Sequence, residues 1–200
     1  MAVQRSPIQE LYRRMDVTLR IRYNAADRLT RHHKLSQWIL ALTSIELIII
    51  PLLQAMQIPM RVNPQLLNAI EVSLAVLTLT YSLLLGMENY YGRAEKTLSC
   101  GKEITKLTRD VYPLLNQSHD AIKYKEMSDR YQDILDKYEN HEPIDYEIYK
   151  INNPEKYYQN KVLYLLAWIS VKIKYILNFW HYIVVSIGIA ASILYIFVIS

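Results

Sequence analysis

The sequence predicts an all-α membrane protein whose transmembrane helices continue into long cytoplasmic helical extensions that form a hairpin or bundle. Three apolar runs each reach the ~20 residues that a helix needs to cross a hydrocarbon core about 30 Å thick. Most of the charged residues, which make up 21% of the 200, lie outside these runs, and there the apolar side chains recur at helical spacing. A single cysteine and only four glycines exclude a disulfide framework and glycine-rich phosphate loops.

The first element is a cytoplasmic N-terminal helix within residues 1–37. Leu11, Met15 and Leu19 begin a row of apolar positions at helical spacing, and no helix breaker precedes Trp38. The first transmembrane helix follows at residues 38–56. We therefore expect one uninterrupted helix that runs from the cytosol into the membrane.

Two further spans are expected. A short external loop, 57–65, leads to the second transmembrane helix at 66–87, and the third transmembrane helix occupies 176–200. The apolar stretch before the third span is broken by Lys172 and Lys174, so residues 161–175 are predicted to form an interfacial helix.

Residues 88–160 are predicted to form a cytoplasmic helical hairpin and a loop. The second span is expected to continue as a helix toward Val111, before Pro113, and a turn follows at 116–118. A helix then returns antiparallel from Asp120, its N-cap, to Tyr138. The polar stretch 139–160 contains two prolines and is predicted to hold a loop or short elements.

The distribution of basic residues predicts the orientation. Of the 23 Lys and Arg residues, all but Arg61 lie in residues 1–37 and 88–174. The positive-inside rule then places the N-terminus and the middle segment in the cytoplasm. No cleavable signal peptide is visible, and the pattern suits a multi-pass protein of a bacterial inner (plasma) membrane, with membrane lipid as its first partner.

Two carboxylates fall inside predicted spans, where a charge costs ~2.5–3.5 kcal/mol on insertion scales. Each lies on a small and polar helix face, and the candidate pore-lining or interhelical residues of these faces are Thr43, Glu46 and Gln54 on the first span and Glu71, Thr78 and Ser82 on the second. One interpretation is a cation-favouring pore or cavity. The other is a protonated glutamate that joins helices of an oligomer. A three-span monomer cannot enclose a wide channel, so a pore requires a homo-oligomer.

No catalytic, cofactor-binding or metal-binding constellation is expected. The neighbouring His32 and His33 point in different directions on a helix, and the remaining candidate ligands carry no metal motif. Those candidates are His119, Asp120, His141 and Asp145. The arginine-rich first helix is explained by anionic headgroups or topology, or alternatively by an anionic nucleotide. We expect a protein that is not an enzyme and binds no nucleic acid directly.

Two segments carry a resemblance to a known family. RYNAADRL at 22–29 precedes the paired spans, and YENHEPIDYEIYK at 138–150 ends the hairpin. Over residues 10–155 the chain resembles the SLATT family of SMODS- and SLOG-associating two-transmembrane effectors, although a third span departs from the family's two-span pattern. The resemblance implies that Asn140, Asp145 and Tyr146 organise the end of the hairpin or contact a regulator; ordinary turn structure would explain them equally.

The resemblance also implies a role in antiviral defence by abortive infection. We expect an oligomeric, pore-forming effector that is activated from the cytoplasmic side, with a nucleotide-signalling or sensor protein as a possible cytosolic partner. The alternatives are a non-conducting membrane-anchored sensor or scaffold for a cytosolic partner and a small cation-coupled transporter. A transporter would usually show internal symmetry, which the sequence lacks.

Overall fold

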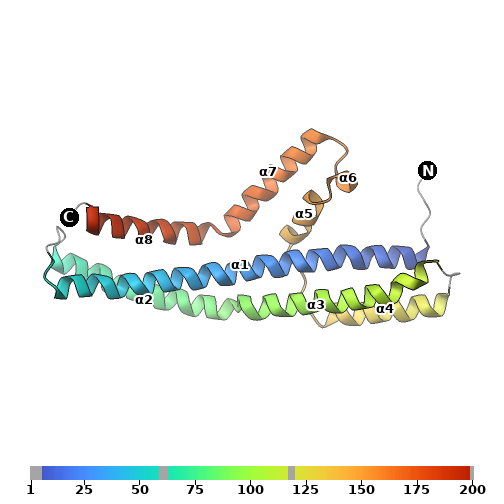
Figure 1. Cartoon of the computed structure of the whole chain (residues 1–200), viewed down its shortest axis with the longest axis horizontal. Coiled ribbons are helices and arrows are strands. Elements are labelled where there is room, and N and C mark those ends of the chain that lie inside the picture. Colours follow the sequence, from blue (N-terminus) through green and yellow to red (C-terminus); the bar gives the residue numbers. More distant parts are fainter. Residues whose placement is uncertain (1–5, 59–62, 117–119, 199–200) are drawn as a thin grey trace. The chain divides into compact units, whose positions relative to one another are not determined.

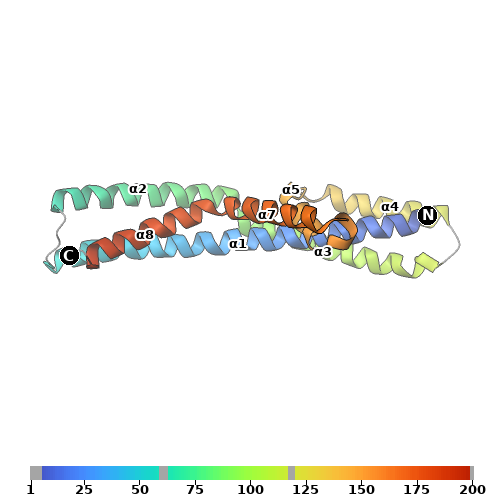
Figure 2. The ribbon, with the colours of Figure 1, turned by 90° about the horizontal axis from the view of Figure 1, so that it is seen from above.

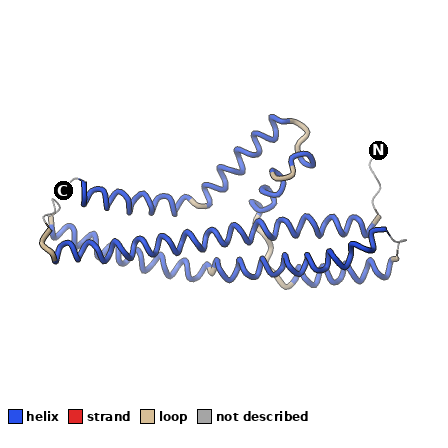
Figure 3. Tube along the Cα trace, viewed as in Figure 1, coloured by secondary structure: helices blue, strands red, loops and turns tan. Residues whose placement is uncertain are grey.

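The protein is described by a computed structural model, which covers residues 6–58, 63–116 and 120–198, with side chains to residue 191. Within these ranges every regular element is helical (Figure 3). Two helices are long and apolar enough to cross a membrane. These observations confirm the predicted all-α membrane protein.

The chain divides into two compact units, which are described separately. Unit 1 contains residues 1–30 and 91–175, and unit 2 contains residues 31–90 and 176–200. Most of the charged residues belong to unit 1, whereas the apolar runs belong to unit 2. The division between charged and apolar segments in the sequence therefore corresponds to the division between the two units.

Helix α1, Pro7–Ala55 (Figure 1), is the longest of the described helices. Its residues belong to both units. It begins with a capping box, because the Gln9 amide donates to Ser6 Oγ at 3.3 Å and the Ser6 amide donates to Gln9 Oε1 at 3.1 Å. Its 49 residues run without a break from the charged segment through the first apolar run. The prediction of one uninterrupted helix is confirmed.

The second long helix is interrupted, which corrects the expectation of continuity. Helix α2, Pro64–Glu88, ends at Asn89, and helix α3 spans Tyr90–Val111. Asn89 has φ 43° and ψ 46°, the left-handed conformation that asparagine tolerates better than most residues. The interruption is thus a single residue long.

The apolar core of unit 1 joins three helices. Helix α4, Ala121–Asp136, lies beside α3 and the first half of α1 (Figure 1). Met15, Ile104, Leu107 and Val111 are almost completely buried there, and Met127 and Ile134 pack against them. The free thiol of Cys100 lies in the same core, where burial raises its pKa. The helical periodicity seen in the sequence therefore marks the packed faces.

Helix caps explain where the shorter elements begin. Asp120 accepts hydrogen bonds from the Ile122 and Lys123 amides at 3.0 and 3.2 Å, so its predicted N-cap role is confirmed. Before it, a 3₁₀ helix covers Tyr112–Asn116, and the rest of the predicted turn, Gln117 and Ser118, lies outside the described residues, as does His119. The polar stretch contains the short helices α5, Pro143–Ile151, and α6, Pro154–Tyr157.

The C-terminal apolar region forms two helices. Helix α7, Lys161–Asn178, and helix α8, Trp180–Val198, are separated at Phe179. The two helices meet at a bend of 56°. Taken together, their described residues are long and apolar enough for one membrane span, whereas neither helix qualifies alone. The third span at 176–200 therefore remains a prediction.

Unit 2 has a largely apolar surface. In this unit, helices α2 and α8 lie beside the C-terminal part of α1 (Figures 1 and 2). Large apolar side chains such as Ile48, Val72 and Leu83 are each more than half exposed. An exposed apolar surface of this extent indicates contact with a membrane or another protein.

Candidate functional site

A cavity of about 700 Å³ lies within unit 2. Helices α1, α2 and α8 all contribute to its wall, which is mostly apolar. Its polar lining residues are Thr43, Glu46, Thr78 and Tyr81. A volume of this size falls in the range of roughly 300–1,000 Å³ that small-molecule sites occupy.

The face of α1 turned to this cavity is the one that the sequence singled out. Thr43 and Glu46 are each 5% exposed and line the cavity, together with Ile50. Gln54 lies one turn further on and donates from Nε2 to Asn68 Oδ1 of α2 at 3.3 Å. Three of the candidate residues thus follow one helix face, two in the cavity and one in an interhelical contact.

On α2 the candidate residues separate. Thr78 lines the cavity, with Tyr81 beside it, whereas Ser82 is exposed. Glu71 is partly buried but does not belong to the cavity wall. Among the described residues, neither Glu71 Oε1 nor Tyr81 Oη has a hydrogen-bond partner. The polar face predicted for α2 is therefore divided between the inside and the outside of unit 2.

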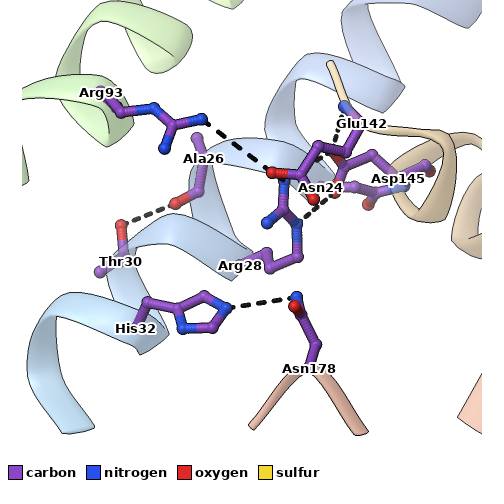
Figure 4. A network of polar contacts seen from close by, with 9 residues as sticks. All are labelled: Asn24, Ala26, Arg28, Thr30, His32, Arg93, Glu142, Asp145 and Asn178. Atoms are coloured by element: carbon purple, nitrogen blue, oxygen red, sulfur yellow. Dashed lines mark hydrogen bonds and ion pairs between the residues drawn. The ribbon is translucent and has the colours of Figure 1, made fainter. Parts of the chain in front are cut away.

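A second polar site, in unit 1, is centred on Arg28. The guanidinium forms a bidentate pair with Asp145, Nε to Oδ1 at 2.9 Å and Nη2 to Oδ2 at 3.1 Å, and also contacts Glu142 Oε1 at 3.0 Å (Figure 4). Arg28 is 4% exposed and Asp145 is fully buried. Burial disfavours the charged guanidinium, but the hydrogen bond and charge of Asp145 outweigh it and raise the pKa of Arg28.

The same carboxylate closes the N-terminus of α5. Asp145 Oδ2 accepts a hydrogen bond from the Glu142 amide at 3.0 Å, as one half of a capping box. Asn24 Nδ2 donates to the Asp145 carbonyl at 3.3 Å. Asp145 therefore connects α5 to the first helix by charge and by hydrogen bonding at once.

Arg22, six residues before Arg28 on α1, reinforces this connection. It is 1% exposed and donates from Nη1 to the Glu139 carbonyl, while Arg93 pairs with the Glu139 carboxylate at 3.3 Å. Burial and the charge of Arg22 lower the pKa of the nearby His141, against the smaller effect of Asp145. Arginines from RYNAADRL thus hold the segment that contains the other family motif.

The three motif residues lie in different environments. Asn140 is exposed, whereas Asp145 is buried in the ion pair. Tyr146 is exposed and stacks on Tyr149 with ring centroids 6.3 Å apart, and Lys150 lies 5.1 Å from its ring centroid. The geometry gives Asp145 a definite structural role and leaves Asn140 and Tyr146 at the surface.

A buried histidine in unit 2 is the third polar feature. His32 Nδ1 lies 3.3 Å from Tyr182 Oη, and Nε2 lies 3.3 Å from Asn178 Nδ2 (Figure 4). Its ring stacks on the rings of Tyr90 and Phe179, at centroid distances of 4.9 and 4.1 Å. These two aromatic residues adjoin the breaks between α2 and α3 and between α7 and α8.

Sequence reasoning missed the partners of Arg28 and His32. It counted Arg28 only as part of a basic helix, and it treated His32 only as half of a histidine pair. The one available signal was that RYNAADRL and the segment around Asp145 both carry the family resemblance. Within the described ranges, no three His, Cys, Asp or Glu side chains group as metal ligands.

Comparison with known proteins identifies a family. No curated protein and no solved structure matches the chain significantly. A family model described as "SMODS and SLOG-associating 2TM effector domain family 5" matches residues 4–196, nearly the whole chain. The resemblance drawn from the two motif segments is thereby confirmed. This all-α membrane protein therefore belongs to the SMODS and SLOG-associating 2TM effector domain family 5.

Proposed function

We propose that the protein is a non-catalytic, oligomeric pore-forming effector that permeabilises a bacterial inner membrane when it is activated from the cytoplasmic side. Family membership makes the chain a membrane effector of a defence or conflict system. The observation that carries the finer proposal is Glu46, a carboxylate buried in the wall of a cavity between the apolar helices. Intramembrane acids that face a cavity favour cation pathways.

The continuity of α1 supports activation from unit 1. The same unbroken helix carries Arg28, paired with Asp145, and Glu46, which lines the cavity. A partner that displaced α5 would break the Arg28–Asp145 pair on this helix. In such a two-state mechanism the partner must bind one state more tightly than the other.

The exposed face of α2 supports assembly. In the 18-residue apolar stretch that makes this helix a candidate span, no residue is buried within the chain. Ala75, Ser82 and Gly86 are exposed, and a Cβ placed on Gly86 would meet nothing within 4 Å. Small residues allow the backbones of two membrane helices to approach closely. We therefore infer that α2 helices of neighbouring copies meet on this face.

Proteoliposomes loaded with a fluorescent ion indicator test the proposal. We expect leakage to rise more steeply than linearly with the protein-to-lipid ratio, because several copies form each pore. Glu46→Gln is expected to reduce cation leakage several-fold, since the amide keeps the shape and removes the charge. Glu95→Gln, an exposed acid of α3, is the matched control and should leak like the wild type.

Two results would contradict parts of this proposal. Equal leakage of wild type and Glu46→Gln would remove the acid from the conduction path. An absence of leakage at every protein-to-lipid ratio, with correct insertion shown by protease protection, would favour a non-conducting anchored scaffold.

A further inference from the structure

The cavity of unit 2 is built by one chain, and one acidic side chain lies in its mostly apolar wall. Its only ionisable carboxylate is Glu46, and the described lining contains no lysine, arginine or histidine. The remaining wall consists mainly of leucine and isoleucine side chains from three helices. A ligand that fits must therefore be largely apolar, and if it is charged it must be a cation.

The hydrogen-bonding groups of the cavity also favour a donor. Thr43 Oγ1 directs its proton to the Ile39 and Leu40 carbonyls, at 2.9 and 3.1 Å, so toward a ligand this oxygen can only accept. The Glu46 carboxylate accepts when ionised, and Tyr81 Oη has no hydrogen-bond partner among the described residues. An ammonium group supplies three N–H donors and a positive charge, which matches this set of groups.

We propose that the α1–α2–α8 cavity is a binding site for hydrophobic amines, with the ammonium group at Glu46 and the apolar body against the leucine and isoleucine wall. The site lies within a single chain, so it does not depend on oligomerisation or on ion conduction. The Tyr81 ring, which lines the same cavity, adds an aromatic surface of the kind that attracts organic cations.

Photolabelling of the full-length protein in detergent tests this site. The probe is an adamantylamine that carries a diazirine on its cage, and adducts are located by mass spectrometry of peptides. We expect adducts on cavity-lining residues of α1, α2 or α8, and we expect unlabelled adamantylamine to compete. Adamantanol, which has the same cage without the charge, should compete about tenfold less well, because hydrogen bonds to charged groups are about twice as strong as neutral ones.

Two pairs of variants separate charge from shape. Glu46→Gln should weaken probe binding about tenfold, whereas Glu71→Gln, an acid of the same unit outside the cavity wall, should leave it unchanged. Gly188 lines the cavity and has open space around an added Cβ, so Gly188→Leu should fold and block the site. Thr80→Leu introduces the same side chain at an exposed position of α2 outside the cavity wall and should bind normally.

Three outcomes would overturn the site. The first is labelling that falls outside the cavity wall. The second is equal competition by the amine and the alcohol. The third is unchanged affinity in both Glu46→Gln and Gly188→Leu. Because binding is read without any ion flux, failure of the pore would leave this result standing, and failure of binding would not exclude a pore.

Discussion

Asp145 shows how one side chain can serve two structural purposes. Its carboxylate binds the buried guanidinium of Arg28 in bidentate geometry and also accepts the Glu142 amide at the start of α5. Removing one partner of a buried pair leaves an uncompensated charge, which costs more than the pair itself contributes. This asymmetry can be measured.

Replacing Arg28 by methionine should destabilise unit 1 by roughly 3–5 kcal/mol, because the Asp145 carboxylate remains buried without its cation. Asp145→Asn keeps an acceptor for the Glu142 amide. The double variant Arg28→Met/Asp145→Asn should therefore lose much less than the sum of the single changes. Thermal unfolding followed by circular dichroism in detergent measures each value, and strictly additive losses would contradict the coupling.

The environment of His141 predicts a pH dependence. Burial and the charge of Arg22 lower its pKa in the folded protein, so protonation favours the unfolded state. The stabilisation is present above the ordinary histidine pKa of about 6.5 and is lost as the pH falls below it. Unfolding measured from about pH 8 to about pH 5.5 should show this decline, and His141→Asn should flatten it. An unchanged slope in that variant would assign the decline to other groups.

At the scale of helices, the breaks are as informative as the long runs. Asn89 separates α2 from α3, Phe179 separates α7 from α8, and the rings of Tyr90 and Phe179 each stack on the ring of His32. Thus both breaks adjoin one buried histidine of α1. His32 therefore packs against an aromatic ring at each of the two breaks.

The left-handed conformation of Asn89 makes the first break testable. Asn89→Gly should be tolerated, since glycine adopts a positive φ without a steric cost. Asn89→Ala should cost about 1 kcal/mol, because alanine lacks the short polar side chain by which asparagine tolerates the left-handed conformation. Thermal unfolding compares the stability of the two variants. Glu88→Ala, a change to alanine at the preceding residue within α2, is the control. A variant Asn89→Ala as stable as Asn89→Gly would argue against the strained conformation.

For the whole molecule, the apolar exterior of unit 2 requires a covering. No residue in the 18-residue apolar stretch of α2 is buried within the chain. Lipid or a second copy of the chain must therefore cover this stretch. The small residues on one side of α2 favour a second copy there, and the large apolar residues elsewhere favour lipid.

Native mass spectrometry in detergent should therefore show an assembly larger than one chain. Ser82→Leu, which adds bulk to the small-residue face of α2, should shift the population toward smaller species. Thr80→Leu changes another exposed hydroxyl residue of the same helix and should leave the distribution unchanged. A monomer under all conditions, or equal effects of both variants, would contradict assembly through this face.

Properties that depend on local sequence were predictable. The unbroken α1 and the Asp120 cap follow from patterns within a few residues, because helix formation and capping are short-range. The apolar runs likewise identify helices able to cross a membrane, because span length depends only on the hydrocarbon thickness. The break at Asn89 escaped prediction, since a single residue of positive φ leaves no clear mark on periodicity.

The polar sites were decided by packing between distant segments. Arg28 and Asp145 are 117 residues apart, and nothing in the arrangement of charges along α1 distinguishes Arg28 from its neighbours. In α2, periodicity placed Ser82 and Thr78 on one face, yet Tyr81 lines the cavity and Ser82 does not. A helix pattern describes which residues share a face, but only the neighbouring helices determine how that face is turned and which buried charge meets which partner.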